Sequence, residues 1–199
     1  MELEGLARQV TERLFVELEA SGRHVHLTKS QSMALFGHSL TPKRPLSQPG
    51  QFLAEERVTL VGPKGSFSRV AVLGPERPEG QVEISLTVGR TLGIEVPVRL
   101  SGDVKDTPGM VLEGEKGRIR LPNGVIAAKW HIHLDRKGAE TFGVKDGQVV
   151  RLQTFTDRPL IFGDVVVRVR EDFANYAHLD FDEANACGFR KGDLGRILP

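Results

Sequence analysis

The 199-residue sequence predicts a mainly β fold, and two observations carry this prediction. From residue 15 onward the chain contains many short segments in which apolar and polar residues alternate, which is the period of a half-buried strand. Glycine and proline, 22 and 11 residues, punctuate these segments at the spacing of a barrel or sandwich. We expect a barrel, because many short strands in an open sheet would leave several edges unprotected.

The chain opens with a predicted amphipathic helix over residues 1–14. Leu3, Leu6, Val10 and Leu14 are spaced three and four apart, with charged residues between them. Further helices are few, and each follows a residue suited to an N-cap and ends near a glycine. These windows are Ser30–Phe36, Arg136–Phe142 and Asp182–Cys187, ending near Gly37, Gly143 and Gly188.

The predicted strands are FVELEAS, HVHLT, RVTLVG, RVAVLG, QVEISLTV, VPVRL, GMVLEGE, GRIRL, VVRLQTF and FGDVVVRVR. In QVEISLTV (81–88), alternation places Val82, Ile84 and Leu86 toward the core and Glu83 on the polar face. The predicted strands therefore cover 65 of the 199 residues, more than the predicted helices do.

Composition argues against several classes of partner and compartment. Lysine and arginine number 27 and acidic residues 26, so the net charge of +1 gives no electrostatic reason to expect nucleic acid or an anionic membrane as partner. No apolar run approaches the roughly 18 residues of a transmembrane helix, and the charged N-terminus does not resemble a secretory signal. The single cysteine, Cys187, cannot form an internal disulfide, which suits a reducing compartment. We expect a cytoplasmic globular protein.

The chain contains weak internal repetition. RHVHLTKSQSMALFG resembles WHIHLDRKGAETFG, and VTLVGPKG (58–65) resembles MVLEGEKG (110–117). Two related halves, each opening with a His-x-His strand followed by a short helix, would explain the first pair.

The two His-x-His pairs indicate a metal-binding function. Since side chains alternate along a strand, His24 and His26 share one face, as do His131 and His133, while Val25 and Ile132 point into a core. Two imidazoles on one rigid face are well placed to bind a first-row metal ion.

The third ligand of each pair is not determined by these patterns. His38 lies in the loop FGHSLTPK and is interpreted as a surface residue, whereas for His178 both a ligand and a structural role stay open. Carboxylates are too numerous to choose among by spacing.

Several longer motifs, in order, resemble one enzyme family. They are RHVHL, LTPKRPLSQPGQF, VTLVGPKG, VLGPERPEGQVEIS, HIH and HLDFDEANA, and they span about residues 15–190. The sequence resembles phosphotransacylases of the PduL type (phosphate propanoyltransferases), which convert acyl-CoA and phosphate to acyl phosphate and CoA. The resemblance implies two small β-barrels with a few short helices and a dinuclear zinc site between them. It also implies one discontinuous barrel of residues 15–22 and 129–199, and a second of residues 23–128.

The resemblance further implies roles for individual residues. One zinc ion would be held by His24, His26 and Glu83, and a second by His131, His133 and His178. Arg77 matches the residue that contacts phosphate and would be catalytic. Four residues match positions that contact coenzyme A: Ser21, Arg23, Lys64 and Asn185.

The implied substrates are phosphate and a short acyl-CoA, propionyl-CoA or acetyl-CoA. We expect direct attack of phosphate on the thioester without an acyl-enzyme, so Cys187 is interpreted as structural. Members of the family often form homodimers, and many act in propanediol degradation inside bacterial microcompartments, to whose shell an N-terminal extension targets them. Residues 1–14 are either a minimal targeting peptide or a cap on a barrel, and we expect the cap.

Two other functions compete with the transacylase. A metallohydrolase also uses His-x-His pairs, but the chain is short and poor in helices for an amidohydrolase barrel and lacks the HxHxDH run of metallo-β-lactamases. A zinc-dependent binding module for a small molecule or anion would keep the histidines, yet would have no need for Arg77, Lys64 and Asn185.

Overall fold

The computed structural model describes residues 2–198, except for the side chains of residues 2–4, 6, 8 and 9. It divides into two compact units. Unit 1 combines Met1–Ser21 with Trp130–Pro199, and unit 2 is Gly22–Lys129. No described helix is long and apolar enough to cross a membrane.

Unit 1 is a closed six-stranded barrel, so the prediction of a mainly β fold with a barrel is confirmed. The strands follow the order β1-β14-β11-β13-β12-β15 around the barrel, and β15 pairs antiparallel with β1 to close it. They are β1 (Val16–Ala20), β11 (His131–Leu134), β12 (Val149–Phe155), β13 (Ile161–Val169), β14 (Tyr176–Leu179) and β15 (Leu194–Leu198).

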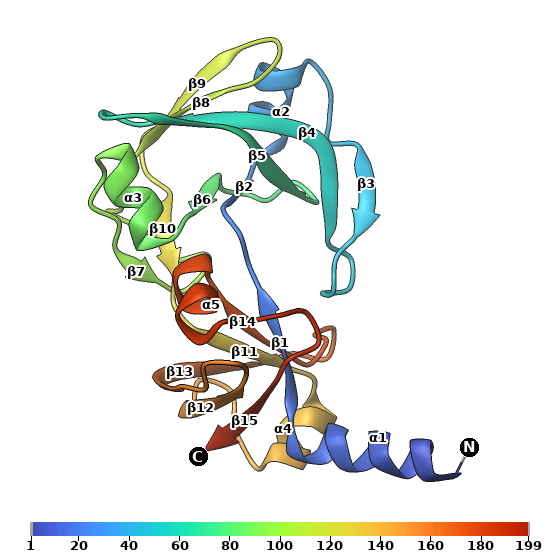
Figure 1. The fold of residues 1–199 in the computed structure, drawn as a ribbon. Helices are drawn as coiled ribbons and strands as arrows, with labels where there is room; N and C mark the ends of the chain where they lie inside the picture. The colour runs from blue at the N-terminus through green and yellow to red at the C-terminus, as the bar shows by residue number, and fades with distance from the viewer. Residues whose placement is uncertain (1, 199) are drawn as a thin grey trace. The chain divides into compact units, whose positions relative to one another are not determined.

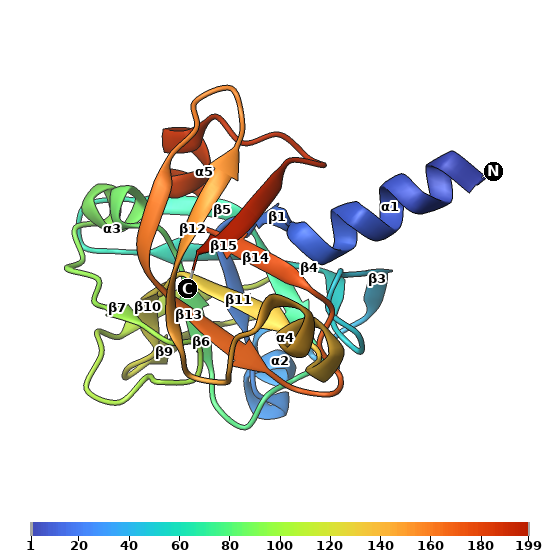
Figure 2. The same ribbon diagram turned by 90° about the horizontal axis from the view of Figure 1, so that it is seen from below.

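Three helices accompany this barrel: α1 (Glu2–Leu14), α4 (Arg136–Phe142) and α5 (Phe181–Cys187). Figure 2 shows α1 extending away from the barrel, with its C-terminal end near α4, which it contacts. Of the predicted apolar stripe, Val10 and Leu14 are about half exposed, 47% and 48%, whereas the side chains of Leu3 and Leu6 lie outside the described residues.

Unit 2 is a half-barrel built from a nine-stranded sheet. Its path runs β7-β10-β6-β2-β5-β4-β8-β9, with β3 paired to β4, and the long β4–β5 hairpin is its most extended part (Figure 1). The strands are β2 (His24–His26), β3 (Pro42–Pro45), β4 (Phe52–Val61), β5 (Ser66–Gly74), β6 (Gln81–Glu83), β7 (Val98–Arg99), β8 (Met110–Glu113), β9 (Arg118–Leu121) and β10 (Val125–Ala128). Its helices are α2 (Lys29–Phe36) and α3 (Leu86–Leu92).

The prediction of one strand over residues 81–88 is wrong. β6 ends at Glu83, and Ser85 then accepts a hydrogen bond from the backbone N–H of Val88 as the N-cap of α3. Leu86, expected in the core, is 41% exposed on this helix, while Glu83, expected on the polar face, is buried.

Each unit has its own apolar core. Val25 and Ile132, the residues between the paired histidines, are fully buried in the cores of unit 2 and unit 1, as predicted. In unit 1, Ala139 of α4 and Ala184 of α5 pack against the barrel strands. Burial of the central residue fixes the direction of each His-x-His strand, and thereby the direction of both imidazoles.

One local structure occurs four times, twice in each unit. It is a strand, an N-cap residue, a short helix and a glycine in the left-handed conformation, with φ between 66° and 80°. The four N-caps are Thr28, Ser85, Asp135 and Asp180, and the helices that follow end at Gly37, Gly93, Gly143 and Gly188. The weak repetition of the sequence therefore corresponds to a repeated supersecondary structure.

The second sequence repeat, VTLVGPKG and MVLEGEKG, has a separate structural basis within unit 2. In each turn the backbone N–H of the lysine, Lys64 or Lys116, donates to a carbonyl at the end of a helix, that of Leu92 or Leu35. This satisfies carbonyl groups that the helix itself leaves without a partner. A Cβ on Gly114 would lie 2.5 Å from the Leu35 oxygen, so the close approach requires glycine there.

Candidate metal centres

The first candidate centre is a buried group in unit 2, formed by His24, His26 and Glu83. β2 and β6 are antiparallel neighbours, and their register places His24 directly opposite Glu83. Nε2 of His24 lies 3.2 Å from Nε2 of His26 and 3.5 Å from Oε2 of Glu83. Nε2 of His26 lies 3.7 Å from Oε1 of Glu83. The two Nε2 atoms and the carboxylate of Glu83 thus converge on one point.

The carboxylate of Glu83 is held by a network of neutral side chains. Its Oε1 accepts hydrogen bonds from the Gln81 amide and, at 2.8 Å, from the Ser101 hydroxyl. Gln81 also donates to Ser101 Oγ at 2.9 Å and accepts from the backbone N–H of Gly102 at 2.8 Å. Glu83 is therefore fixed in place although it carries a charge in a buried position.

The hydrogen bond from His24 to the backbone determines which of its nitrogens is a ligand. Nδ1 lies 2.8 Å from the carbonyl oxygen of Gly22, which can only accept, so Nδ1 carries a hydrogen. The lone pair of the neutral ring is then on Nε2, the atom that faces His26 and Glu83. Backbone support of this kind is the usual arrangement behind a metal-binding histidine.

Burial and charge set the protonation of this group. Burial raises the pKa of Glu83, but the charges and hydrogen bonds of His24 and His26 outweigh it and hold that pKa well below 4.5. Burial lowers the pKa of His26 to about 4. Burial also lowers the pKa of His24, yet the charge and hydrogen bond of Glu83 and the bond to Gly22 raise it overall. The group therefore offers an anionic oxygen and a neutral imidazole, which suit a divalent cation.

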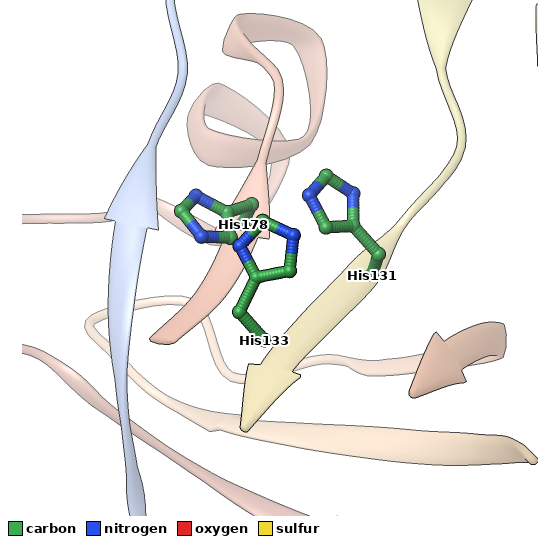
Figure 3. A group of neighbouring side chains, drawn as sticks. All are labelled: His131, His133 and His178. Carbon is green, nitrogen blue, oxygen red and sulfur yellow. The ribbon is translucent and has the colours of Figure 1, made fainter. Parts of the chain in front are cut away.

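The second candidate centre is in unit 1, where His131, His133 and His178 come together from β11 and β14 (Figure 3). The register pairs His131 with His178, and the ring of His133 lies 4.7 Å from each of the others between centroids. Nδ1 of His178 lies 3.3 Å from Oε2 of Glu19 on β1, and Phe173 covers His133 at 4.1 Å. The structure thus brings His178, left open by the sequence, to the predicted pair.

Both groups fit a zinc ion. In each of them the donor atoms lie within 4.8 Å of one another. Zinc bonds of about 2.0–2.1 Å in a tetrahedron require donor atoms about 3.3 Å apart, close to the 3.2–3.7 Å spacings in unit 2. Each group offers three protein ligands, the number found in catalytic zinc sites.

Arg77 lies beside the centre of unit 2. Its backbone N–H donates to the Leu27 carbonyl at 2.8 Å, and its Nη1 lies 3.4 Å from Ser101 Oγ. Its positive charge is close enough to act on both histidines: it adds to the fall in the pKa of His26 and opposes the overall rise in the pKa of His24. A half-buried guanidinium therefore adjoins the three donor atoms, where it can bind an anion.

Two residues predicted to contact coenzyme A belong to unit 2. The guanidinium of Arg23 lies 4.8 Å from the centre of the Phe67 ring, a cation–π contact that orients it. Lys64 is exposed, and its side-chain carbons lie over Gly93, where a Cβ would approach Cγ of Lys64 to 2.6 Å. Both cations are thus exposed or partly exposed on this unit.

The other two such residues belong to unit 1. The backbone N–H of Ser21 donates to the carbonyl of Leu179 at 2.7 Å. Asn185 on α5 is exposed, and its backbone carbonyl accepts from the backbone N–H of Gly188. The contacts of Ser21 and Asn185 with coenzyme A stay a prediction.

The remaining histidine and the cysteine lie apart from the donor groups. His38 has an exposed side chain, as predicted, whose Nδ1 lies 2.8 Å from the Ser39 carbonyl. Cys187 is fully buried in the core of unit 1, and burial raises the pKa of its thiol. A buried thiol with a raised pKa is a poor nucleophile.

Sequence reasoning missed the residues that support the ligands, namely Gln81, Ser101, Glu19 and Phe173. Only Gln81 had a usable signal, because it stands two residues before Glu83 and therefore shares its face of the strand. Ser101 lies 18 residues beyond Glu83 in the sequence. Glu19 lies on β1, which pairs with β14 although the two strands are far apart in the sequence.

Comparison with known proteins assigns these features to one family. The sequence profile described as phosphate propanoyltransferase matches residues 17–190. A phosphate propanoyltransferase of Listeria monocytogenes is 51% identical over 199 residues, covering 97% of this chain and 93% of the relative. The enzyme of that name from Clostridioides difficile is 48% identical, covering 98% and 95% of the two chains. A third, from Thermotoga maritima, is 52% identical, covering 89% and 86%.

Proposed function

Because this chain belongs to the phosphate propanoyltransferase family of acyltransferases, we propose that it transfers a short acyl group from coenzyme A to inorganic phosphate. The substrates are acetyl-CoA or propionyl-CoA and phosphate, and the products are the acyl phosphate and free CoA. The reaction needs no oxidant and no nucleoside triphosphate, only a site that brings an anion against a thioester.

The observation that supports this proposal best is the position of Arg77 beside the His24, His26 and Glu83 donor group. A thioesterase activates water with the metal alone and does not require a cation beside the metal ligands to hold its nucleophile. Phosphate, in contrast, matches the forked donors of a guanidinium. A metal-binding group with an adjoining arginine is therefore suited to phosphate as the nucleophile.

Two zinc ions are the proposed cofactors, one held by His24, His26 and Glu83 and the other by His131, His133 and His178. Zinc bound at these groups would supply a Lewis acid for the oxygens of phosphate and of the thioester carbonyl. The protein residues supply the remaining functions, which are binding, orientation and charge neutralisation.

Arg77 holds phosphate with one oxygen free for attack, and Ser101 orients the guanidinium through the contact to Nη1. That phosphate oxygen forms a bond to the carbonyl carbon, the carbon–sulfur bond breaks, and its electron pair leaves on the CoA sulfur. A thiol has a pKa of about 8.5, so the thiolate can leave without a strong general acid. Fixing both substrates in this orientation accounts for much of the acceleration.

We propose that coenzyme A is contacted by Ser21, Arg23, Lys64 and Asn185, and that transfer is direct. Cys187 is fully buried, so its thiol is in no position to accept an acyl group. Propanediol degradation in a microcompartment, a homodimer and a cytoplasmic location stay predictions from the resemblance. The role of α1 as a cap on unit 1 stays a prediction: the helix contacts α4, but its Val10 and Leu14 are about half exposed.

The proposal is tested by measuring CoA release from acetyl-CoA and propionyl-CoA, with and without phosphate, on zinc-loaded and chelator-treated protein. Release that requires both phosphate and metal is expected. His133→Ala should lose it, whereas His38→Ala, a histidine change outside both groups, should keep it.

Each other outcome points elsewhere. Release without phosphate would identify a thioesterase, and hence the metallohydrolase alternative. No release while zinc remains bound would favour the binding module.

A further inference from the structure

The candidate metal ligands occupy two fixed positions in the fourfold repeat of strand, N-cap and helix. Counting back from the N-cap, the residue at minus two is His26, Glu83, His133 or His178, so it is a candidate ligand in all four copies. The residue at minus four is His24 or His131 in the first copy of each unit. In the second copies it is Gln81 or Tyr176.

In each unit the strand register arranges these four positions as two pairs of residues that face each other across neighbouring strands. In unit 2, His24 lies opposite Glu83, and His26 lies opposite Gln81. In unit 1 the pairs are His131 with His178 and His133 with Tyr176. In each unit three of these four residues are candidate ligands, and the fourth, Gln81 or Tyr176, is not. Gln81 therefore occupies a position where a ligand would otherwise stand, which calls for a reason.

The contacts of Gln81 exclude it as a ligand. Its side chain is 97% buried, being 3% exposed, and its Nε2 donates to both Glu83 and Ser101. Its only oxygen, Oε1, accepts from the backbone N–H of Gly102 at 2.8 Å. Both polar atoms of the amide are thus engaged, Nε2 with Glu83 and Ser101 and Oε1 with Gly102, so the side chain is not free to turn toward a metal.

These contacts divide the two oxygens of Glu83 between different tasks. Oε1 accepts from Gln81 and Ser101, so its lone pairs are engaged in hydrogen bonds. Oε1 also lies 3.7 Å from Nε2 of His26, but it is held by these two hydrogen bonds, whereas Oε2 lies 3.5 Å from Nε2 of His24 and remains for a metal. A carboxylate held in this way binds through one oxygen, whereas a free carboxylate can also bind through two. One-oxygen binding leaves a coordination position open for substrate.

The Ser101 hydroxyl joins this network to the phosphate-binding residue. A serine hydroxyl has one hydrogen to donate and two lone pairs to accept with. Its hydrogen goes to Glu83, and its oxygen faces donors from Gln81 at 2.9 Å and Arg77 at 3.4 Å. Removing the hydroxyl would release a metal ligand and the guanidinium together.

We propose that Gln81 and Ser101 are positioning residues that restrict Glu83 to one-oxygen binding and align it with Arg77. This inference rests on the metal-dependent function proposed above and adds residues that do not themselves contact metal or substrate. It explains why the residue opposite His26 is a glutamine, since a fourth ligand at that position would fill the coordination position that phosphate needs.

The test uses the full chain reconstituted with Co²⁺, whose visible absorption reports coordination number. Ser101→Ala and Gln81→Met remove the hydrogen bonds to Glu83, and Ser101→Thr keeps a hydroxyl. Ser32→Ala is the matched control, because Ser32 is buried in unit 2 but its Oγ has no hydrogen-bond partner among the described residues. Circular dichroism melting confirms that each variant is folded.

We expect Ser101→Ala and Gln81→Met to weaken binding of one of two Co²⁺ ions by about 10- to 100-fold. The absorption bands should shift toward those of a higher coordination number, and Ser101→Ala should also raise KM for phosphate. Ser101→Thr and Ser32→Ala should resemble the wild type. If the wild type binds two Co²⁺ ions and both variants match it in affinity and spectrum, the positioning role of Gln81 and Ser101 is overturned while the proposed metal sites stand. Should the wild type bind no Co²⁺ at Glu83, the proposed zinc site fails and the inference with it.

Discussion

Replacing Ile132 by alanine is expected to destabilise unit 1 strongly, because this side chain anchors the strand that carries two candidate ligands. Ile132 lies between His131 and His133, is fully buried, and belongs to the core of the closed barrel. The change removes three carbon atoms from a position at which the surrounding strands cannot easily close the gap.

The size of the effect follows from burial. Truncating a fully buried isoleucine to alanine costs about 2–5 kcal/mol, since the lost transfer free energy is joined by the cost of a cavity. Ile161 on β13 offers the same chemical change in the same barrel but is 58% exposed. Its replacement by alanine should cost less than about 1 kcal/mol, as for most surface substitutions.

Urea unfolding followed by tryptophan fluorescence measures both variants. The only tryptophan of the chain, Trp130, lies in unit 1 with its ring edge-on to Phe162 at 4.7 Å, so its emission reports on this unit. With m values of about 1–3 kcal/mol/M, a loss of about 3 kcal/mol lowers the midpoint by about 1–3 M. Equal midpoints for Ile132→Ala and Ile161→Ala would refute the argument that burial of Ile132 holds the ligand strand.

Three further changes test the site and its surroundings. Arg77→Ala should raise KM for phosphate by about 10- to 150-fold and KM for acyl-CoA much less, because a charge-assisted hydrogen bond is worth about 1.5–3 kcal/mol; initial-rate kinetics with each substrate varied would contradict the phosphate role if both constants rose equally. Cys187→Ala should keep phosphate-dependent CoA release while losing about 1 kcal/mol of stability, since the thiol is buried and unreactive; an inactive but folded variant, or a trapped acyl-enzyme, would overturn direct transfer. Burial and the Asp180 carboxylate raise the pKa of Glu183 to about 8, so the folded protein binds this proton more tightly than the unfolded chain, and the resulting stability is complete below about pH 4.5 and lost as the pH rises through about 8. Glu183→Gln should remove that part of the pH dependence in urea unfolding at several pH values, and an unchanged slope would show that Glu183 is not its source.

Local patterns in the sequence predicted the features that depend on neighbouring residues. The His-x-His strands follow from the period of two, and buried Val25 and Ile132 confirm their direction. Helices α2 and α5 begin with capping boxes, Thr28 with Gln31 and Asp180 with Glu183, and both were predicted within two residues of their observed start. These signals lie within one turn or one strand of the residues they describe.

Helix α3 was missed because its local signals conflict. Its N-cap, Ser85, has Val88 at the position where a capping box needs glutamate or glutamine. Thr87 and Val88 are β-branched and favour a strand, so alternation appeared to continue past Glu83. The consequence was that Glu83, a buried candidate ligand, was placed on a polar face.

The third ligands could not be derived from local pattern. Glu83 follows His26 by 57 positions and His178 follows His133 by 45, and only the strand register brings them together. Nothing in the residues around Glu83 distinguishes it from the other carboxylates of the chain. The resemblance to a family named these residues, and strand pairing supplies the physical reason.

The discontinuity of unit 1 has a consequence for how the protein is made. Strand β1 is among the first parts to leave the ribosome, yet its parallel partner β14 begins at Tyr176, 156 positions after Ala20. At synthesis rates of about 5–20 residues per second, β1 waits about 8–30 s for that partner, while unit 2 is completed in the interval. An unpaired strand is a hazard for aggregation, and charged side chains are a common protection. Glu17 and Glu19 supply two charges within the five residues of β1. The strand that stays unpaired longest during synthesis therefore carries charges that disfavour its association with other chains.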